Sequence, residues 1–131
     1  MILLDTHAIL WLVLKPDRLS KPATRAIVRA ERSDGVAVAS ITLWEIAQLV
    51  DVGRVRIHGS TEGFLESLCR RPGVRVLGIT PEIAALAFRF PPDFTQDPAD
   101  RLIGATARVH GLRLVTRDGP MHDCPLLDTV W

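Results

Sequence analysis

The sequence has little cysteine, little lysine and no long apolar run. Its two cysteines, Cys69 and Cys124, are too few and too far apart for a disulfide framework or a cysteine-based metal cluster. No apolar run approaches the roughly 20 residues needed to cross a bilayer, so we expect no membrane segment. The N-terminus lacks a basic region and carries Asp5 within its apolar stretch, which makes it a poor signal peptide. Together these absences predict a cytoplasmic protein with reduced thiols.

The charge is nearly balanced, because sixteen basic and fifteen acidic side chains give a net charge of +1. The total charge therefore does not indicate a nucleic-acid-binding protein. Lys15 and Lys21 are the only lysines, so the remaining cations are arginines. The planar guanidinium suits phosphate groups, but a high-GC coding bias produces the same skew, and we favour the bias. A length of 131 residues with 47% hydrophobic residues predicts a single globular domain over residues 1–131.

Short apolar runs alternate with segments of helical periodicity along the whole chain. We expect buried strands at 1–5, 36–40, 74–79, 112–116 and 126–130, with a short extended piece at 55–57. Helices are expected at about 6–14, 20–34, 43–52, 61–71, 80–90 and 97–110, with Thr6, Ser20, Thr80 and Asp97 as N-caps. This alternation predicts an α/β fold, with a parallel sheet between two layers of helices.

In such a fold the carboxyl ends of the strands and the N-termini of the following helices lie at one edge of the sheet. Four acidic residues are expected there: Asp5 after the first strand, Glu45 and Asp100 in the first turns of two helices, and Asp118 after the fourth strand. Three of them also have an ordinary structural interpretation. Glu45 would complete a capping box, Asp100 would offset the helix dipole, and Asp118 would belong to a turn. Asp5 has no evident local role at the end of an apolar strand, so it favours a functional site.

Carboxylates gathered at one edge repel one another, and burial raises their pKa values. No lysine accompanies them, and Arg101 and Arg117 are the nearest cations in sequence. A hard divalent cation is the natural counter-charge, because oxygen ligands suit Mg²⁺ or Mn²⁺, whereas no paired Cys/His spacing favours zinc. An open carboxylate site for such a metal predicts phosphate chemistry with a metal-activated water.

Small residues around these acids add further expectations. Thr6, Ser40 and Thr116 each lie next to a strand end and could support the metal or its water, or could be plain helix caps. Gly104 follows Asp100 by one helical turn and is expected to leave room for substrate.

Four motifs give the chain a resemblance to a known family: LLDTH at 3–7, ASITLWEIA at 39–47, DPADRLI at 97–103 and LVTRD at 114–118. In this order and at these separations they resemble PIN-domain ribonucleases, and specifically the VapC toxins of type II toxin–antitoxin modules. The resemblance covers nearly the whole chain. It implies that Asp5, Glu45 and Asp100 form the acidic metal site, that Asp118 is the most variable fourth acid, and that Asp97 is the helix N-cap. Arg101 belongs to the same motif and is a candidate for substrate contact.

The resemblance also implies a three-layer α/β/α fold with a parallel sheet of four or five strands in the order 3-2-1-4-5. It implies RNA cleavage dependent on Mg²⁺ or Mn²⁺, and a homodimer that forms a heterotetramer or larger assembly with a VapB-type antitoxin. Such antitoxins wrap a groove near the N-terminal helices, where Trp11, Leu12, Leu14 and Leu49 could form the lining or could simply be core.

Two other functions remain open from the residues alone. A haloacid-dehalogenase-like phosphatase would use Asp5 as nucleophile, but it needs a second Asp two residues later, where this chain has His7. A non-catalytic module would use the acidic residues to bind a basic peptide, which the complete carboxylate set disfavours. His7 itself is interpreted as a residue at the start of a helix.

Overall fold

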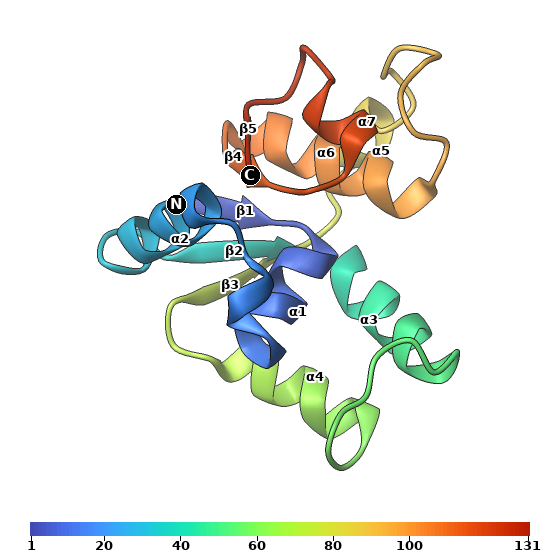
Figure 1. The fold of residues 1–131 in the computed structure, drawn as a ribbon. Helices are drawn as coiled ribbons and strands as arrows, with labels where there is room; N and C mark the ends of the chain where they lie inside the picture. The colour runs from blue at the N-terminus through green and yellow to red at the C-terminus, as the bar shows by residue number, and fades with distance from the viewer.

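A computed structural model of the protein describes all 131 residues and contains one five-stranded sheet (Figure 1). The strands are all parallel and lie in the order β3-β2-β1-β4-β5. Their bounds are β1 (Ile2–Leu4), β2 (Val36–Ala39), β3 (Val74–Leu77), β4 (Arg113–Val115) and β5 (Thr129–Val130). The predicted parallel sheet and its strand order are therefore confirmed.

Helices cover both faces of the sheet, as expected for a three-layer α/β/α fold. They are α1 (Thr6–Leu14), α2 (Lys21–Glu31), α3 (Ile41–Asp51), α4 (Thr61–Arg70), α5 (Pro81–Leu86), α6 (Pro98–His110) and α7 (Gly119–His122), with a 3₁₀ turn, η1 (Pro16–Arg18). Figure 1 places α5, α6 and α7 on one side of the sheet and α1, α2 and α4 on the other. None of these helices combines the length and the apolar character needed to cross a membrane.

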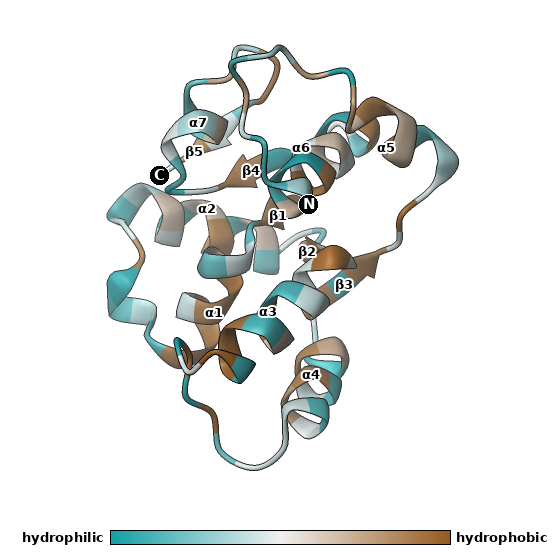
Figure 2. Ribbon diagram, turned by 90° about the vertical axis from the view of Figure 1, so that its right-hand side faces the viewer, coloured by the Kyte–Doolittle hydropathy of each residue, from teal (hydrophilic) through white to brown (hydrophobic).

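The three central strands, β2, β1 and β4, contribute much of the core because their apolar residues are buried on both faces. In β1, Leu3 packs with the α5–α7 layer, and Leu4 packs with the α1–α4 layer. β2 alternates in the same way, and in β4 Leu114 and Val115 also face opposite layers. This alternation explains why the strands are continuous apolar runs, coloured brown in Figure 2.

Most of the predicted helix boundaries are confirmed by their caps. Side-chain oxygens of Ser20, Thr80 and Asp97 accept backbone N–H groups at the starts of α2, α5 and α6. Gly111 ends α6 with φ +62°, a left-handed conformation that favours glycine.

One expectation about the elements is wrong and one helix was missed. The fifth strand contains only Thr129–Val130, because the chain makes a turn in which the Leu127 N–H donates to the Cys124 carbonyl. The short helix α7 after β4 was not expected, and the piece at 55–57 pairs with no strand of the sheet.

Candidate metal centre at the carboxyl edge of the sheet

Asp5 lies where β1 ends and α1 begins. Its backbone N–H donates to the Val115 carbonyl (3.1 Å), which extends the sheet by one residue. One carboxylate oxygen, Oδ1, accepts the Ala8 N–H at 2.7 Å, so Asp5 is the N-cap of α1. The expectations that Asp5 has no local role and that Thr6 caps this helix are therefore wrong. Asp5 is 7% exposed, so this capping carboxylate is nearly buried.

Glu45 lies in the second turn of α3 and not in the first, because the helix already begins at Ile41. It makes no capping box. Its Oε1 instead accepts a hydrogen bond from the Thr6 hydroxyl, which also lies 3.2 Å from the Thr42 hydroxyl. This contact ties the start of α1 to α3 and directs the Glu45 carboxylate. Ser40, at the start of α3, makes no capping hydrogen bond through its side chain.

Asp97 and Asp100 lie at the N-terminus of α6. Oδ1 of Asp97 accepts the N–H groups of Ala99 (2.8 Å) and Asp100 (3.3 Å), as predicted for an N-cap residue. The Asp100 carboxylate is held by a long hydrogen bond of 3.4 Å from the Thr95 hydroxyl.

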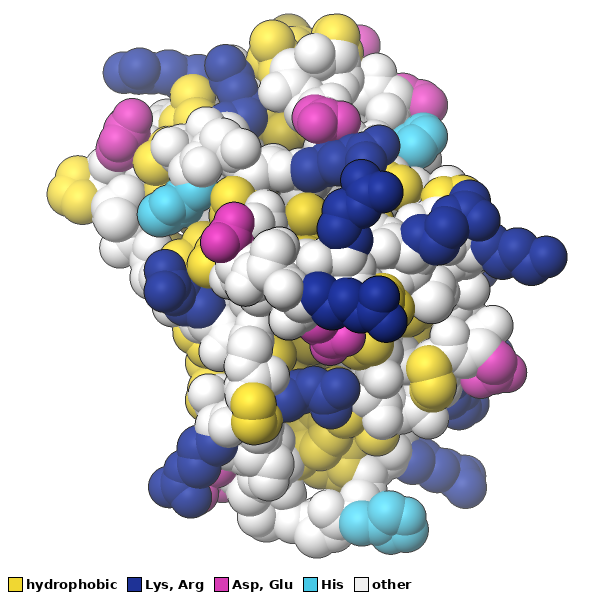
Figure 3. All heavy atoms as spheres, turned by 90° about the vertical axis from the view of Figure 1, so that its left-hand side faces the viewer, with side chains coloured by type: hydrophobic (Ala, Val, Ile, Leu, Met, Phe, Trp, Pro, Cys, Tyr) yellow, Lys and Arg dark blue, Asp and Glu magenta, His cyan; other side chains and the backbone are white.

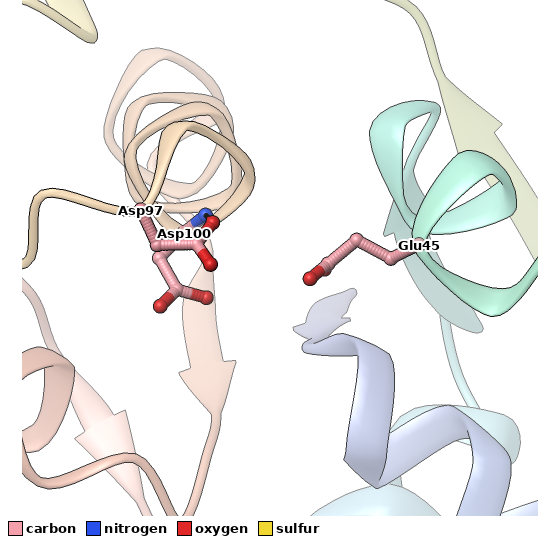
Figure 4. Close-up of side chains that lie close together, drawn as sticks. All are labelled: Glu45, Asp97 and Asp100. Carbon is pink, nitrogen blue, oxygen red and sulfur yellow. Dashed lines mark hydrogen bonds between the residues drawn. The ribbon is translucent and has the colours of Figure 1, made fainter. Parts of the chain in front are cut away.

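Three carboxylates meet at this edge. One oxygen from each of Glu45, Asp97 and Asp100 lies within 4.8 Å of the others. Figure 4 shows Glu45 extending from α3 toward the two aspartates of α6. Asp97 was expected only as a helix cap, although its spacing of three residues from Asp100 places both on one side of the first helical turn.

Asp5 and Asp118 lie outside this group of three but act on it. Asp118 is the N-cap of α7, where it accepts the Met121 N–H at 3.0 Å, so it has a structural role at the start of a helix and not in a simple turn. Its own N–H donates to the Thr116 hydroxyl at 3.0 Å, and the same hydroxyl hydrogen bonds to Asp5. Thr116 therefore links the Asp5 carboxylate to the backbone of Asp118.

Burial and mutual repulsion raise the pKa values of Asp5, Glu45 and Asp100. Desolvation is the largest cause for Asp100, whose pKa rises from 3.8 to about 7 under the added repulsion of Asp97, Asp118, Glu45 and Asp5. Desolvation also raises the pKa of Asp5, against hydrogen bonds from Thr116 and Ala8. It raises the pKa of Glu45 as well, against the Thr6 hydroxyl. The expected repulsion is present, but loss of water contributes more than any single neighbouring charge.

No basic side chain of the protein forms an ion pair with these acids. The ion pairs present join the Met1 amino group to Asp34 and Arg113 to Asp128, both away from this edge. Arg101 uses its Nε and Nη1 atoms to donate to the Thr95 and Ala87 carbonyls, at 2.8 and 3.1 Å. It therefore stabilises the loop before α6, including the segment that carries Thr95.

Gly104 does not leave room for substrate as expected. A Cβ atom at this position would lie 3.0 Å from Cζ of Phe90 and 3.5 Å from Cζ of Phe94, both in the core. Phe90 and Phe94 stack with ring centroids 4.2 Å apart. Glycine is required here for close packing of α6 on these rings.

The donor set fits a hard divalent cation. Glu45, Asp97 and Asp100 offer carboxylate oxygens, and no basic side chain of the chain forms an ion pair with them. Burial raises the pKa of Glu45 and of Asp100, so a nearby positive charge would stabilise their ionised forms. Oxygen-only sites of this kind suit Mg²⁺ or Mn²⁺.

Comparison with known proteins gives consistent matches. The family model for the PIN domain matches residues 2–124. The chain is 43% identical over 132 residues to ribonuclease VapC22 of Mycobacterium tuberculosis, which spans 99% of this chain and 98% of that protein.

Solved structures share the fold at low sequence identity. The VapBC2 complex of Rickettsia felis, bound to a DNA fragment from its promoter, matches with a TM-score of 0.72, 15% identity and coverage of 99% and 98%. VapC20 of Mycobacterium tuberculosis, a toxin that cleaves the sarcin–ricin loop, matches with a TM-score of 0.62, 19% identity and 91% of each chain.

Proposed function

Because the chain belongs to the PIN-domain family, we propose that it is a metal-dependent endoribonuclease of the VapC type, formed as one domain over residues 1–131. The observation that carries this proposal is the group of Glu45, Asp97 and Asp100, three carboxylates within 4.8 Å that no cation of the chain neutralises. The reaction is hydrolysis of an RNA phosphodiester bond by water.

Glu45, Asp97 and Asp100 would hold Mg²⁺, or Mn²⁺ in its place. When bound, the metal ion supplies a Lewis acid that activates water and stabilises charge on phosphate oxygens. The raised pKa of Asp100 supports this assignment. Burial and the neighbouring carboxylates make the Asp100 carboxylate unfavourable in the metal-free protein, and a bound cation would offset that free energy.

The other residues of this edge orient the acids. The Thr6 hydroxyl directs Glu45, and the Thr116 hydroxyl links Asp5 to Asp118. Asp5 and Asp118 add negative charge next to the group of three, and we assign them to binding metal or to orienting the attacking water. Arg101 of α6 supports the site by holding the Thr95 carbonyl of the loop before that helix. Ser40, directly before α3, is kept as a candidate contact for the substrate.

The partner we propose is a VapB-type antitoxin. A hollow of about 810 Å³ lies beside α1 and is lined by apolar side chains that include Trp11, Leu14 and Leu49. Leu12, which was also expected to line it, packs against the core instead. His7 borders the same hollow, so an antitoxin segment bound there would end close to the acidic edge.

We also propose that two copies associate and that the antitoxin brings them into a heterotetramer or larger assembly in the cytoplasm. Phe88 is 85% exposed and borders an apolar hollow of about 310 Å³ between α5 and α6. In the proposed dimer, the exposed ring of each copy would enter the hollow of the other, because a two-fold interface uses the same surface on both copies.

Cleavage of purified RNA with and without Mg²⁺ tests the proposed activity. We expect cleavage that EDTA abolishes, and loss of at least about 100-fold in the Asp100→Asn and Glu45→Gln variants, because each removes a charged oxygen from the site. Cleavage at the normal rate by Asp100→Asn protein would refute the proposal. A site that never binds Mg²⁺ in a titration would instead favour the non-catalytic module.

A further inference from the structure

A third hollow, of about 390 Å³, follows α2 on the β4–β5 side of the sheet. It begins at the amino ends of β1 and β4, at the edge opposite the carboxylates, and extends along α2 as far as Val130. Its floor is apolar and includes Ile2 and Ala26, and three arginines line it: Arg25, Arg29 and Arg113. We call it the α2 groove.

Two arginines of the α2 groove form no ion pair within the protein. Arg25 and Arg29 are exposed, lie one helical turn apart and have no acidic partner within ion-pair distance. Four residues of helix rise about 6 Å, so the two guanidinium groups can contact one stretch of a ligand. Like charges at this spacing destabilise a helix, so helix stability does not explain the pair.

The third arginine adds to this charge only in part, since Arg113 pairs with Asp128 at 3.4 Å and both side chains are largely exposed. Figure 3 views the molecule from the side of α2 and shows Lys and Arg side chains gathered across the middle of this face, with hydrophobic atoms between them. A polyanion would find here the cations that the acidic edge lacks.

The negative charge of the acidic edge indicates which anion binds in the groove. The carboxylates there repel a polyanionic substrate, and Arg101 is held by two backbone carbonyls of its own loop. An RNA strand delivered to that edge therefore needs cations elsewhere on the surface, because phosphate contacts dominate RNA affinity. Guanidinium groups bind phosphate oxygens through paired hydrogen bonds, and arginines line this groove.

We propose that the α2 groove binds the phosphodiester backbone of the RNA at a distance from the cleavage site, with Arg25 and Arg29 as the main contacts. This rests on the proposed ribonuclease function. The groove starts at the edge of the sheet opposite the carboxylates, so an RNA must pass over the surface from one edge to the other to occupy both places. The groove therefore favours a folded hairpin over a short strand.

Fluorescence anisotropy with a labelled RNA hairpin, in EDTA so that the RNA stays intact, tests the groove. The Arg25→Ala/Arg29→Ala variant of the full chain should bind about tenfold more weakly, and the slope of log affinity against log salt should fall by about one to two. Arg70→Ala/Arg71→Ala removes the same charge at the end of α4 and is the matched control, expected to stay within about twofold of the unmodified protein.

Equal losses in both double variants would overturn the proposal, because they would reflect total charge alone. The proposal would also be overturned if the Arg25→Ala/Arg29→Ala variant kept its affinity for the hairpin but lost binding of polyglutamate. That result would identify an acidic polypeptide as the ligand of the groove. The thermal unfolding midpoint of each variant shows whether it is folded.

Cleavage in Mg²⁺ separates this proposal from the proposed function. The Arg25→Ala/Arg29→Ala variant should still cleave a short single strand at the normal rate and lose rate only on the hairpin. If the unmodified protein cleaves no RNA, the ribonuclease proposal fails, while the anisotropy comparison still decides whether the groove binds RNA.

Discussion

Neutralising Asp100 should make the metal-free protein more stable although it removes an acid of the site. Asp100→Asn keeps the shape of the side chain and removes its charge. In the folded chain this charge faces Glu45 and Asp97 within 4.8 Å, with Asp118 and Asp5 adding further repulsion. The variant should therefore gain stability and lose cleavage, which a purely structural helix-cap role for Asp100 does not allow.

The size and sign of the gain follow from the pKa of Asp100. Folding raises this pKa from 3.8 to about 7, so ionisation costs the folded state nothing below about pH 4 and its full amount above pH 7. Three pKa units correspond to about 4 kcal/mol, which we halve because Asp100 is partly exposed and screened by solvent. Losing a first-turn charge removes about 0.3–1 kcal/mol of helix-dipole stabilisation. The net gain at pH 8 is thus about 1–2 kcal/mol.

Urea unfolding in EDTA measures this difference at about pH 8, 6.5 and 5. These values lie on both sides of the Asp100 pKa of about 7. We expect the advantage of Asp100→Asn to be largest at pH 8 and to shrink steadily as the pH falls. Asp93→Asn, in an exposed loop, is the matched control and should show no such dependence. A variant less stable than the unmodified protein at pH 8, or a difference that is constant with pH, would refute this account.

Three further predictions concern other parts of the structure. Asp5→Asn should keep α1 folded by circular dichroism, because Asn also caps helices, and should lose RNA cleavage; a loss of helix content would contradict the double role. Gly104→Val should lower the free energy of unfolding by about 1–3 kcal/mol in a urea titration, since its side chain would enter the Phe90 ring; an unchanged value would contradict the packing. Mg²⁺ at about 100 times its Kd for the unmodified protein should stabilise that protein by about 2.7 kcal/mol in thermal melts. A similar gain for Asp100→Asn at the same Mg²⁺ concentration would argue against Asp100 as a metal ligand.

The fold could be predicted from the sequence because its signals are local and repeated. Buried parallel strands leave continuous apolar runs, and the proline after Thr80 or Asp97 marks the start of a helix. The family resemblance supplied the strand order, which local patterns do not contain. The last strand was predicted too long because its apolar residues, such as Leu127, turn into the core without pairing.

The site was predicted less completely, since its geometry depends on contacts between distant elements. Asp5 was expected to have no structural role because the sequence does not show whether α1 begins at Thr6 or one residue later. Either the Asp5 carboxylate or the Thr6 hydroxyl could then be the N-cap. The structure uses that hydroxyl to hold Glu45, thirty-nine positions away. Gly104 was expected to face substrate because helical spacing gives the turn but not which neighbour packs on it.

The position of β1 in the sheet has a consequence for how the protein is made. β1 is synthesised first, yet it lies between β2 and β4, and its pairing with β4 joins Leu4 to Val115. Such distant pairings form late in folding. On the ribosome, a nascent chain that stops before Asp97 has Asp5 and Glu45 but neither aspartate of α6. We therefore expect synthesis to leave the cell's RNA uncut until α6 has folded onto the sheet, which gives a partner time to bind the earlier helices.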